Sequence, residues 1–180
     1  MACFVVFLRG INVGGHIVTK TTLQDAFSCL GFRDVSTFKQ SGNIIFQADT
    51  SDPEAVKKQI ETKLGQVLAF KVAVFVRTLE ELKNIKALDP FKGHEEKDTD
   101  FQVTFLESTP PQFPFTFPAR IPKSTADVVS ACGSEVFSVT RGHGDGGMPN
   151  PFLESKLKVQ ATTRNWNVVR EIAERYGENK

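Results

Sequence analysis

The chain has 180 residues, of which 40% are hydrophobic and 24% charged, with a formal net charge of +1. This length fits one domain or two small ones, and the composition is typical of a soluble globular protein. The near-neutral charge excludes a strong overall basic field, so extended nucleic-acid binding is disfavoured, while a shorter nucleic-acid segment stays open as a ligand.

The first residues and the cysteines predict a cytoplasmic protein without a membrane span. Residues 3–8 are apolar, but the run is too short for a signal peptide or a span and no basic segment precedes it. Cys3, Cys29 and Cys132 are far apart among apolar neighbours, which predicts buried, reduced thiols. The three histidines are also scattered and no C-x-x-C pair occurs, so we expect neither a metal nor a cofactor.

The first half of the chain predicts four strands. Residues 3–8 have the continuous apolar pattern of a central strand. Residues 35–39 and 44–47 are β-prone segments separated by a polar, Gly-containing turn, which is typical of a hairpin. Residues 72–76 are equally apolar and complete the set.

Three helix starts lie between or after these strands. Thr21 and Gln24 match a capping box, in which each side chain bonds a free backbone N–H at the helix start. Asp52, which a proline follows, predicts the start of a second helix. Thr78 and Glu81 predict the start of a short third helix.

Residues 1–78 therefore have the order β-α-β-β-α-β, which predicts a ferredoxin-like unit. Right-handed crossovers place the first and third strands in the middle of its sheet. Residues 79–180 predict a smaller C-terminal α+β subdomain packed on the first. It contains a strand at 102–106, a hairpin of 127–131 with 135–140, and a last helix that begins near Thr163.

Two polar turns are the main candidate binding site. In the predicted topology, the turn after the first strand and the hairpin turn lie at the same end of neighbouring strands. Glycines let backbone N–H groups approach a ligand, a helix start adds positive potential, and arginine suits phosphate or carboxylate. The alternative is that these residues only build tight turns. The candidate residues are Arg9, Asn12, Gly14, Gly15, Gln40, Ser41 and Asn43.

A third cluster lies in Thr162-Thr163-Arg164-Asn165-Trp166-Asn167. If either threonine is the N-cap of the last helix, Thr163, Arg164 and Asn165 surround free N–H groups that suit an anion. The alternative is a capped helix whose tryptophan anchors it in the core. We predict that this cluster joins the two turns in one composite site.

No segment identifies a reaction. The Gly-rich turn has neither Walker A nor dinucleotide-binding spacing. His143 and Asp145 lie two residues apart, but no serine or cysteine nucleophile is identifiable as their partner, so a flexible loop is the prediction.

Four segments resemble a known family. R-G-I-N-V-G-G at 9–15, L-G-F-x-D-V at 30–35, T-F-K-Q-S-G-N-I-I-F at 37–46 and T-T-R-N-W-N at 162–167 are similar to the signature of domain-of-unknown-function family 1697. The resemblance implies a small, soluble, mostly bacterial protein of two linked α+β subdomains. It implies no activity and no functional residues.

Arginines, amides and helix starts favour a binding module for an anionic ligand, such as a phosphate-bearing metabolite or a nucleic-acid segment. The alternative is an enzyme of unrecognised reaction that acts on a small anionic substrate.

Overall fold

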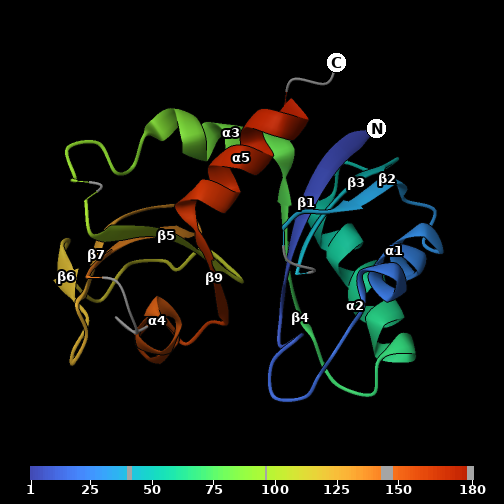
Figure 1. Cartoon of the computed structure of the whole chain (residues 1–180), viewed down its shortest axis with the longest axis horizontal. Helices are drawn as coiled ribbons and strands as arrows, with labels where there is room; N and C mark the ends of the chain where they lie inside the picture. Colours follow the sequence, from blue (N-terminus) through green and yellow to red (C-terminus); the bar gives the residue numbers. More distant parts are fainter. Residues whose placement is uncertain (40–41, 96, 143–147, 178–180) are drawn as a thin grey trace. The chain divides into compact units, whose positions relative to one another are not determined.

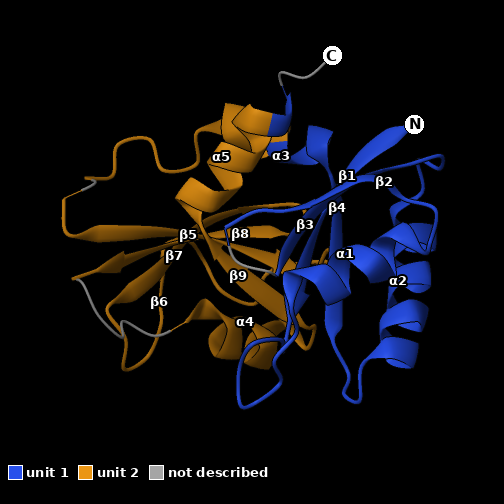
Figure 2. Cartoon of the chain, turned by 45° about the vertical axis from the view of Figure 1, so that its right-hand side comes forward, with its two compact units in different colours: residues 1–82, 176–180 blue, residues 83–175 orange. Residues whose placement is uncertain are grey.

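The computed structural model describes residues 1–39, 42–95, 97–142 and 148–177. The chain divides into two compact units (Figure 2): unit 1 is residues 1–82 with 176–180, and unit 2 is residues 83–175. The predicted boundary after residue 78 falls at the end of a strand, shortly before this division.

Unit 1 is a four-stranded antiparallel sheet with two helices. The strand order is β2-β3-β1-β4, so β1 and β3 are the middle strands. Figure 1 shows both helices on one face of this sheet. The elements are β1 (Ala2–Arg9), α1 (Lys20–Ser28), β2 (Arg33–Thr37), β3 (Asn43–Ala48), α2 (Pro53–Val67) and β4 (Ala73–Thr78).

Large rings fill the core of unit 1. Phe4 of β1 and Phe46 of β3 lie side by side with ring centroids 5.9 Å apart. Phe27 of α1 meets Phe46 edge-on at 5.3 Å, and Phe32 stacks on Phe46 at 4.3 Å. Burial of these rings removes a large apolar area from water, which holds the helices on the sheet.

Two of the three predicted helix starts are confirmed. Asp52 caps α2, and Thr78 and Glu81 each accept the other's backbone N–H. The predicted start of α1 is wrong. Thr19, rather than Thr21, is the N-cap, because its hydroxyl accepts the N–H three residues later at 3.1 Å.

The remaining strands form a second antiparallel sheet, which lies in unit 2 and has the order β6-β7-β8-β5-β9. The predicted strand and hairpin correspond to β5 and to β7 with β8. With two such sheets and their helices, the α+β class is confirmed. The elements are α3 (Leu79–Leu88), β5 (Thr99–Leu106), β6 (Ala119–Arg120), β7 (Ala126–Cys132), β8 (Glu135–Arg141), α4 (Pro149–Leu157), β9 (Ala161–Asn165) and α5 (Trp166–Gly177).

The two faces of the unit 2 sheet differ in character. On one face, Phe91 stacks on Phe101 at 4.6 Å and meets Trp166 and Phe137 edge-on. Alternation along the strands sends the neighbouring side chains to the opposite face. That face carries four buried hydroxyl residues, Thr104, Ser138, Thr140 and Thr163.

None of the three cysteines, all of which lie in the described part of the chain, is in a disulfide, and their predicted burial is wrong for two of them. Cys29 and Cys132 are exposed, because they lie where α1 and β7 end and the chain turns at the surface. Cys3 on β1 is half-buried.

Candidate functional site

The two predicted turns of unit 1 adjoin one another. Leu8, next to the last residue of β1, donates its backbone N–H to the carbonyl of Gly42 over 2.8 Å. This bond joins the β1 turn, which begins at Arg9, to the β2–β3 hairpin, and it confirms the adjacency expected from topology. Gln40 and Ser41 of the hairpin lie outside the described residues.

The asparagines of these turns hold the backbone. Asn12 has a left-handed conformation, with φ of 55°, and its Oδ1 accepts the N–H of Val18 at 2.9 Å. Asn43 is only 3% exposed, and its Nδ2 donates to the carbonyl of Phe38 at 3.1 Å. Side chains committed to these bonds shape the turns, which matches the structural alternative for both asparagines.

Gly14 and Gly15 leave the tip of the first turn open. Both have positive φ, 57° and 86°, and no other atom lies within 4 Å of where a Cβ would stand. Their backbone N–H groups have no hydrogen-bond partner among the described residues. The glycines therefore serve the positive-φ backbone of this turn.

The third predicted cluster spans the end of β9 and the start of α5, and the prediction that a threonine caps the helix is wrong. Asn165 is the N-cap of α5, because its Oδ1 accepts the N–H of Asn167 at 2.9 Å. Thr163 lies in β9, where its hydroxyl is 2.7 Å from that of Thr104 and donates to Asn150 Oδ1. β-Branched threonines suit a strand paired with β5, and this pairing outweighs their use as caps.

Arg164 points to the face of β9 opposite Thr163. Its guanidinium donates to the hydroxyl of Thr162 and to the carbonyl of Thr163, both at 2.8 Å. Burial lowers the pKa of Arg164 to about 10, so the side chain stays protonated at neutral pH. Register thus separates Arg164 from its predicted partners Thr163 and Asn165.

The predicted composite site draws on both units. Arg9, Asn12 and the glycines belong to unit 1, whereas Thr163 and Arg164 belong to unit 2. Their joining into one site stays a prediction.

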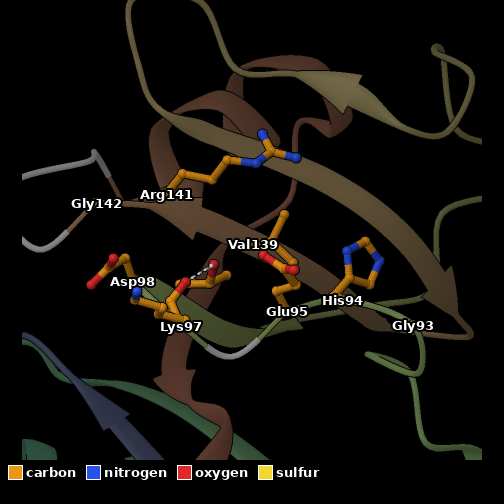
Figure 3. Close-up of a pocket in the computed structure, with 9 residues that line it drawn as sticks. Gly93, His94, Glu95, Lys97, Asp98, Val139, Arg141 and Gly142 are labelled. Atoms are coloured by element: carbon orange, nitrogen blue, oxygen red, sulfur yellow. Dashed lines mark hydrogen bonds between the residues drawn. The ribbon is translucent and has the colours of Figure 1, made fainter.

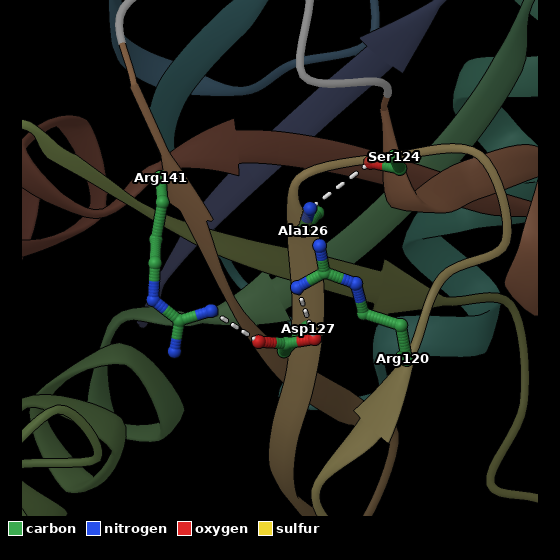
Figure 4. Close-up of polar contacts among 5 residues, drawn as sticks. All are labelled: Arg120, Ser124, Ala126, Asp127 and Arg141. Carbon is green, nitrogen blue, oxygen red and sulfur yellow. Dashed lines mark hydrogen bonds and ion pairs between the residues drawn. The ribbon is translucent and has the colours of Figure 1, made fainter.

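The unit 2 sheet carries a charged cluster that was not predicted from the sequence. Asp127 of β7 lies between Arg120 of β6 and Arg141 of β8 (Figure 4). One carboxylate oxygen accepts from Arg120 at 3.1 Å, and the other accepts from Arg141 at 2.5 Å. The Asp127 side chain is 14% exposed, whereas those of Arg120 and Arg141 are 59% and 60% exposed.

Electrostatics keep this cluster charged. Burial raises the pKa of Asp127, but the hydrogen bonds and positive charges of Arg141 and Arg120 outweigh it and lower the pKa below its ordinary value of 3.8. At neutral pH two guanidinium groups thus share one carboxylate, which leaves a local charge of +1 and several donors directed to solvent.

Arg141 also lines a pocket of about 380 Å³. Figure 3 shows its side chain on the β8 side, across from the loop that precedes β5. The described lining residues are Gly93, His94, Glu95, Lys97, Asp98, Thr99, Val139, Arg141 and Gly142. Arg141 therefore connects the charged cluster to a concave surface.

The missed cluster had only a faint sequence signal. Asp127 is a single carboxylate in an otherwise uncharged strand segment, between Ala126 and Val128, which hinted at a specific partner. Its partners come from two other strands, so only the sheet register brings them together.

Two further findings concern the residues that the structure describes. Among them, no three His, Cys, Asp or Glu side chains are placed to hold a metal ion. No helix in this part of the chain has the length and apolar character to cross a membrane. His143 and Asp145 lie outside the described residues.

Comparisons with known proteins place the chain by sequence and by fold. The family described as "Protein of unknown function (DUF1697)" matches residues 1–137. No curated protein matches the chain. Conserved bacterial protein SP0830 from Streptococcus pneumoniae has a similar fold, with a TM-score of 0.66 and 19% identity over 96% of this chain and 97% of that one.

Proposed function

Because the chain belongs to the DUF1697 family of unknown function, we propose from its own geometry that it is a binding module for a phosphate-bearing ligand. The observation that carries this proposal is the pair Arg120 and Arg141, held on either side of Asp127 beside an open pocket. The anionic group of the ligand contacts the outward N–H groups of both arginines.

The two ion pairs of Asp127 contribute too little to stability to explain this arrangement by themselves. Exposed ion pairs contribute only about 0–1 kcal/mol, because solvent screens them and ordering long side chains costs entropy. The shared carboxylate instead holds two guanidinium groups in place before a ligand arrives, which lowers the entropy cost of binding. No other partner of either guanidinium is found among the described residues.

The β1 turn is a second place for the same class of ligand. Its support is the backbone N–H groups of Gly14 and Gly15, for which no partner is found among the described residues, in the turn that follows Arg9. Asn12, Asn43, Thr163 and Asn165 make structural bonds, so in this proposal they shape the surface and do not contact ligand.

The proposal includes a ferredoxin-like unit 1 and a cytoplasmic protein. The order β1-α1-β2-β3-α2-β4, with β1 and β3 in the middle of the sheet, supports the first part. Detection of the endogenous protein in a cytoplasmic fraction tests the second.

A thermal-shift screen tests the binding proposal. The probes are inorganic phosphate, adenosine monophosphate, glucose 6-phosphate, a short RNA and, as a neutral control, glucose. A ligand at a hundred times its dissociation constant adds about 2.7 kcal/mol of stability. We expect stabilisation by phosphate-bearing probes, its loss in Arg141→Gln, and its retention in Arg33→Gln, which removes the exposed Arg33–Asp49 pair of unit 1.

The outcomes separate the alternatives. If a probe stabilises wild type and Arg141→Gln equally but does not stabilise Arg9→Ala, the binding site is at the β1 turn instead. Stabilisation by glucose alone rejects the anionic ligand. A response to RNA without one to the small phosphates identifies a nucleic-acid segment. Chemical conversion of a bound probe makes the protein an enzyme.

A further inference from the structure

The pocket beside Arg141 is lined by charges of both signs. Lys97 and Arg141 are basic, whereas Glu95 and Asp98 are acidic, so the formal charges of these four described residues cancel. This balance distinguishes the pocket from the neighbouring Arg120–Asp127–Arg141 cluster, whose net charge is positive.

The two sides of the pocket differ in formal charge. Arg141 comes from the end of β8, whereas Glu95, Lys97 and Asp98 all come from the loop before β5 (Figure 3), so the loop side carries a formal charge of −1 from these three residues. Asp98 is fixed in this loop, because its carbonyl accepts the N–H of Gly142 at 2.8 Å and its φ is 55°. The carboxylate of Glu95 has no ion-pair partner among the described residues.

We propose that the ligand of this pocket carries an amine as well as an anionic group. This inference rests on the proposed function, since Arg141 receives the anionic group. The ammonium group then lies toward Glu95 and Asp98, where each carboxylate accepts charge-assisted hydrogen bonds. A ligand with only negative charge faces the same carboxylates across a pocket of about 380 Å³ and is repelled by them.

Two matched probes test the inference: phosphoethanolamine and ethyl phosphate. Both carry a phosphate on a two-carbon chain, and only the first carries an ammonium group. Titration is followed by ¹H–¹⁵N NMR at pH 7.5 and low ionic strength, because salt screens such exposed charges. We expect phosphoethanolamine to bind at least about fivefold more tightly than ethyl phosphate, a ratio typical of one favourable charge contact.

The double variant Glu95→Gln/Asp98→Asn isolates the acidic side of the pocket. Both changes keep the shape of the side chain, and asparagine tolerates the left-handed backbone of residue 98. We expect phosphoethanolamine to lose its advantage and ethyl phosphate to keep or gain affinity. Glu54→Gln on the exposed start of α2 in unit 1 is the matched control and leaves both affinities unchanged.

The result also separates this inference from the proposal on which it rests. Equal affinity of wild type for the two probes overturns the amine and leaves the phosphate site standing. An advantage of phosphoethanolamine that survives in the double variant overturns the assignment to Glu95 and Asp98. Binding of neither probe overturns the phosphate site and this inference together.

Discussion

In unit 1, the helix-covered face of the sheet is apolar, with Phe4, Ile44 and Phe46 fully buried. In unit 2, one face of the sheet buries hydroxyl groups beside its apolar residues. The side-chain hydroxyls of Ser138 and Thr140 on this face have no hydrogen-bond partner among the described residues. The buried side chains of the first sheet thus stabilise the fold, whereas the unpartnered buried hydroxyls of the second sheet lower its stability. Such unsatisfied groups need a structural or functional explanation.

The largest expected effect on stability is at the centre of the unit 1 core. Phe46→Ala leaves a cavity where three rings meet, and we expect a loss of about 3–5 kcal/mol in the free energy of unfolding. Denaturant unfolding measures it. Val67→Ala, at a 43% exposed position in the same unit, is the control and changes stability by less than about 0.5 kcal/mol. A loss below about 1 kcal/mol for Phe46→Ala contradicts the apolar core.

The satisfied hydroxyls of unit 2 have an intermediate effect. Thr163→Val removes bonds to Thr104 and Asn150, so we expect a loss of about 1–3 kcal/mol. A double-mutant cycle with Thr104→Val should show coupling, because the second change then removes a partner that is already lost. Strictly additive losses argue against the Thr104–Thr163 bond.

The unsatisfied hydroxyls should behave in the opposite way. Ser138→Ala removes a buried oxygen that has no partner among the described residues, so we expect a change between about zero and a gain of 1 kcal/mol. The same denaturant measurement, set beside Thr163→Val, gives the contrast. A loss above 1 kcal/mol shows that the Ser138 hydroxyl is bonded.

The smallest effect is the pH dependence of the charged cluster. The pKa of Asp127 is lowered in the folded state, so its contribution to stability is present above the ordinary value of 3.8 and is lost as pH falls through the folded-state pKa. Asp127→Asn removes this contribution, and the difference in stability between wild type and variant should therefore shrink below about pH 4. Unfolding curves between pH 2 and 7 measure it. A difference independent of pH excludes the ion pairs.

Much of unit 1 could be predicted because its information is local. The apolar runs of β1 and β3 and the Asp52 and Thr78 caps are each contained in a short segment. The start of α1 was misplaced because Thr19, Thr21 and Thr22 offer similar caps, and the register of the helix decides among them.

Unit 2 was harder because its key contacts are distant in sequence. Thr163 matched a helix cap locally, but pairing of β9 with β5 places it in a strand. The Arg120–Asp127–Arg141 cluster depends on the pairing of β6, β7 and β8, which no short motif reveals. Gly14 and Gly15 were identified correctly as turn residues, whereas the structural bonds of Asn12 and Asn43 follow from the folded turns.

One NMR titration with inorganic phosphate tests the central claim, that Arg120 and Arg141 receive an anionic group. Asp127→Asn removes the carboxylate that holds both guanidinium groups, so it should bind phosphate more weakly than wild type although the local charge rises from +1 to +2. Arg141→Gln, which also removes a guanidinium group, should bind more weakly still, and the control Asp49→Asn in the Arg33 pair should match wild type. We expect this order of affinities, with chemical-shift changes centred on Arg120 and Arg141. Equal affinities for all four proteins, or shifts confined to other residues, would contradict it.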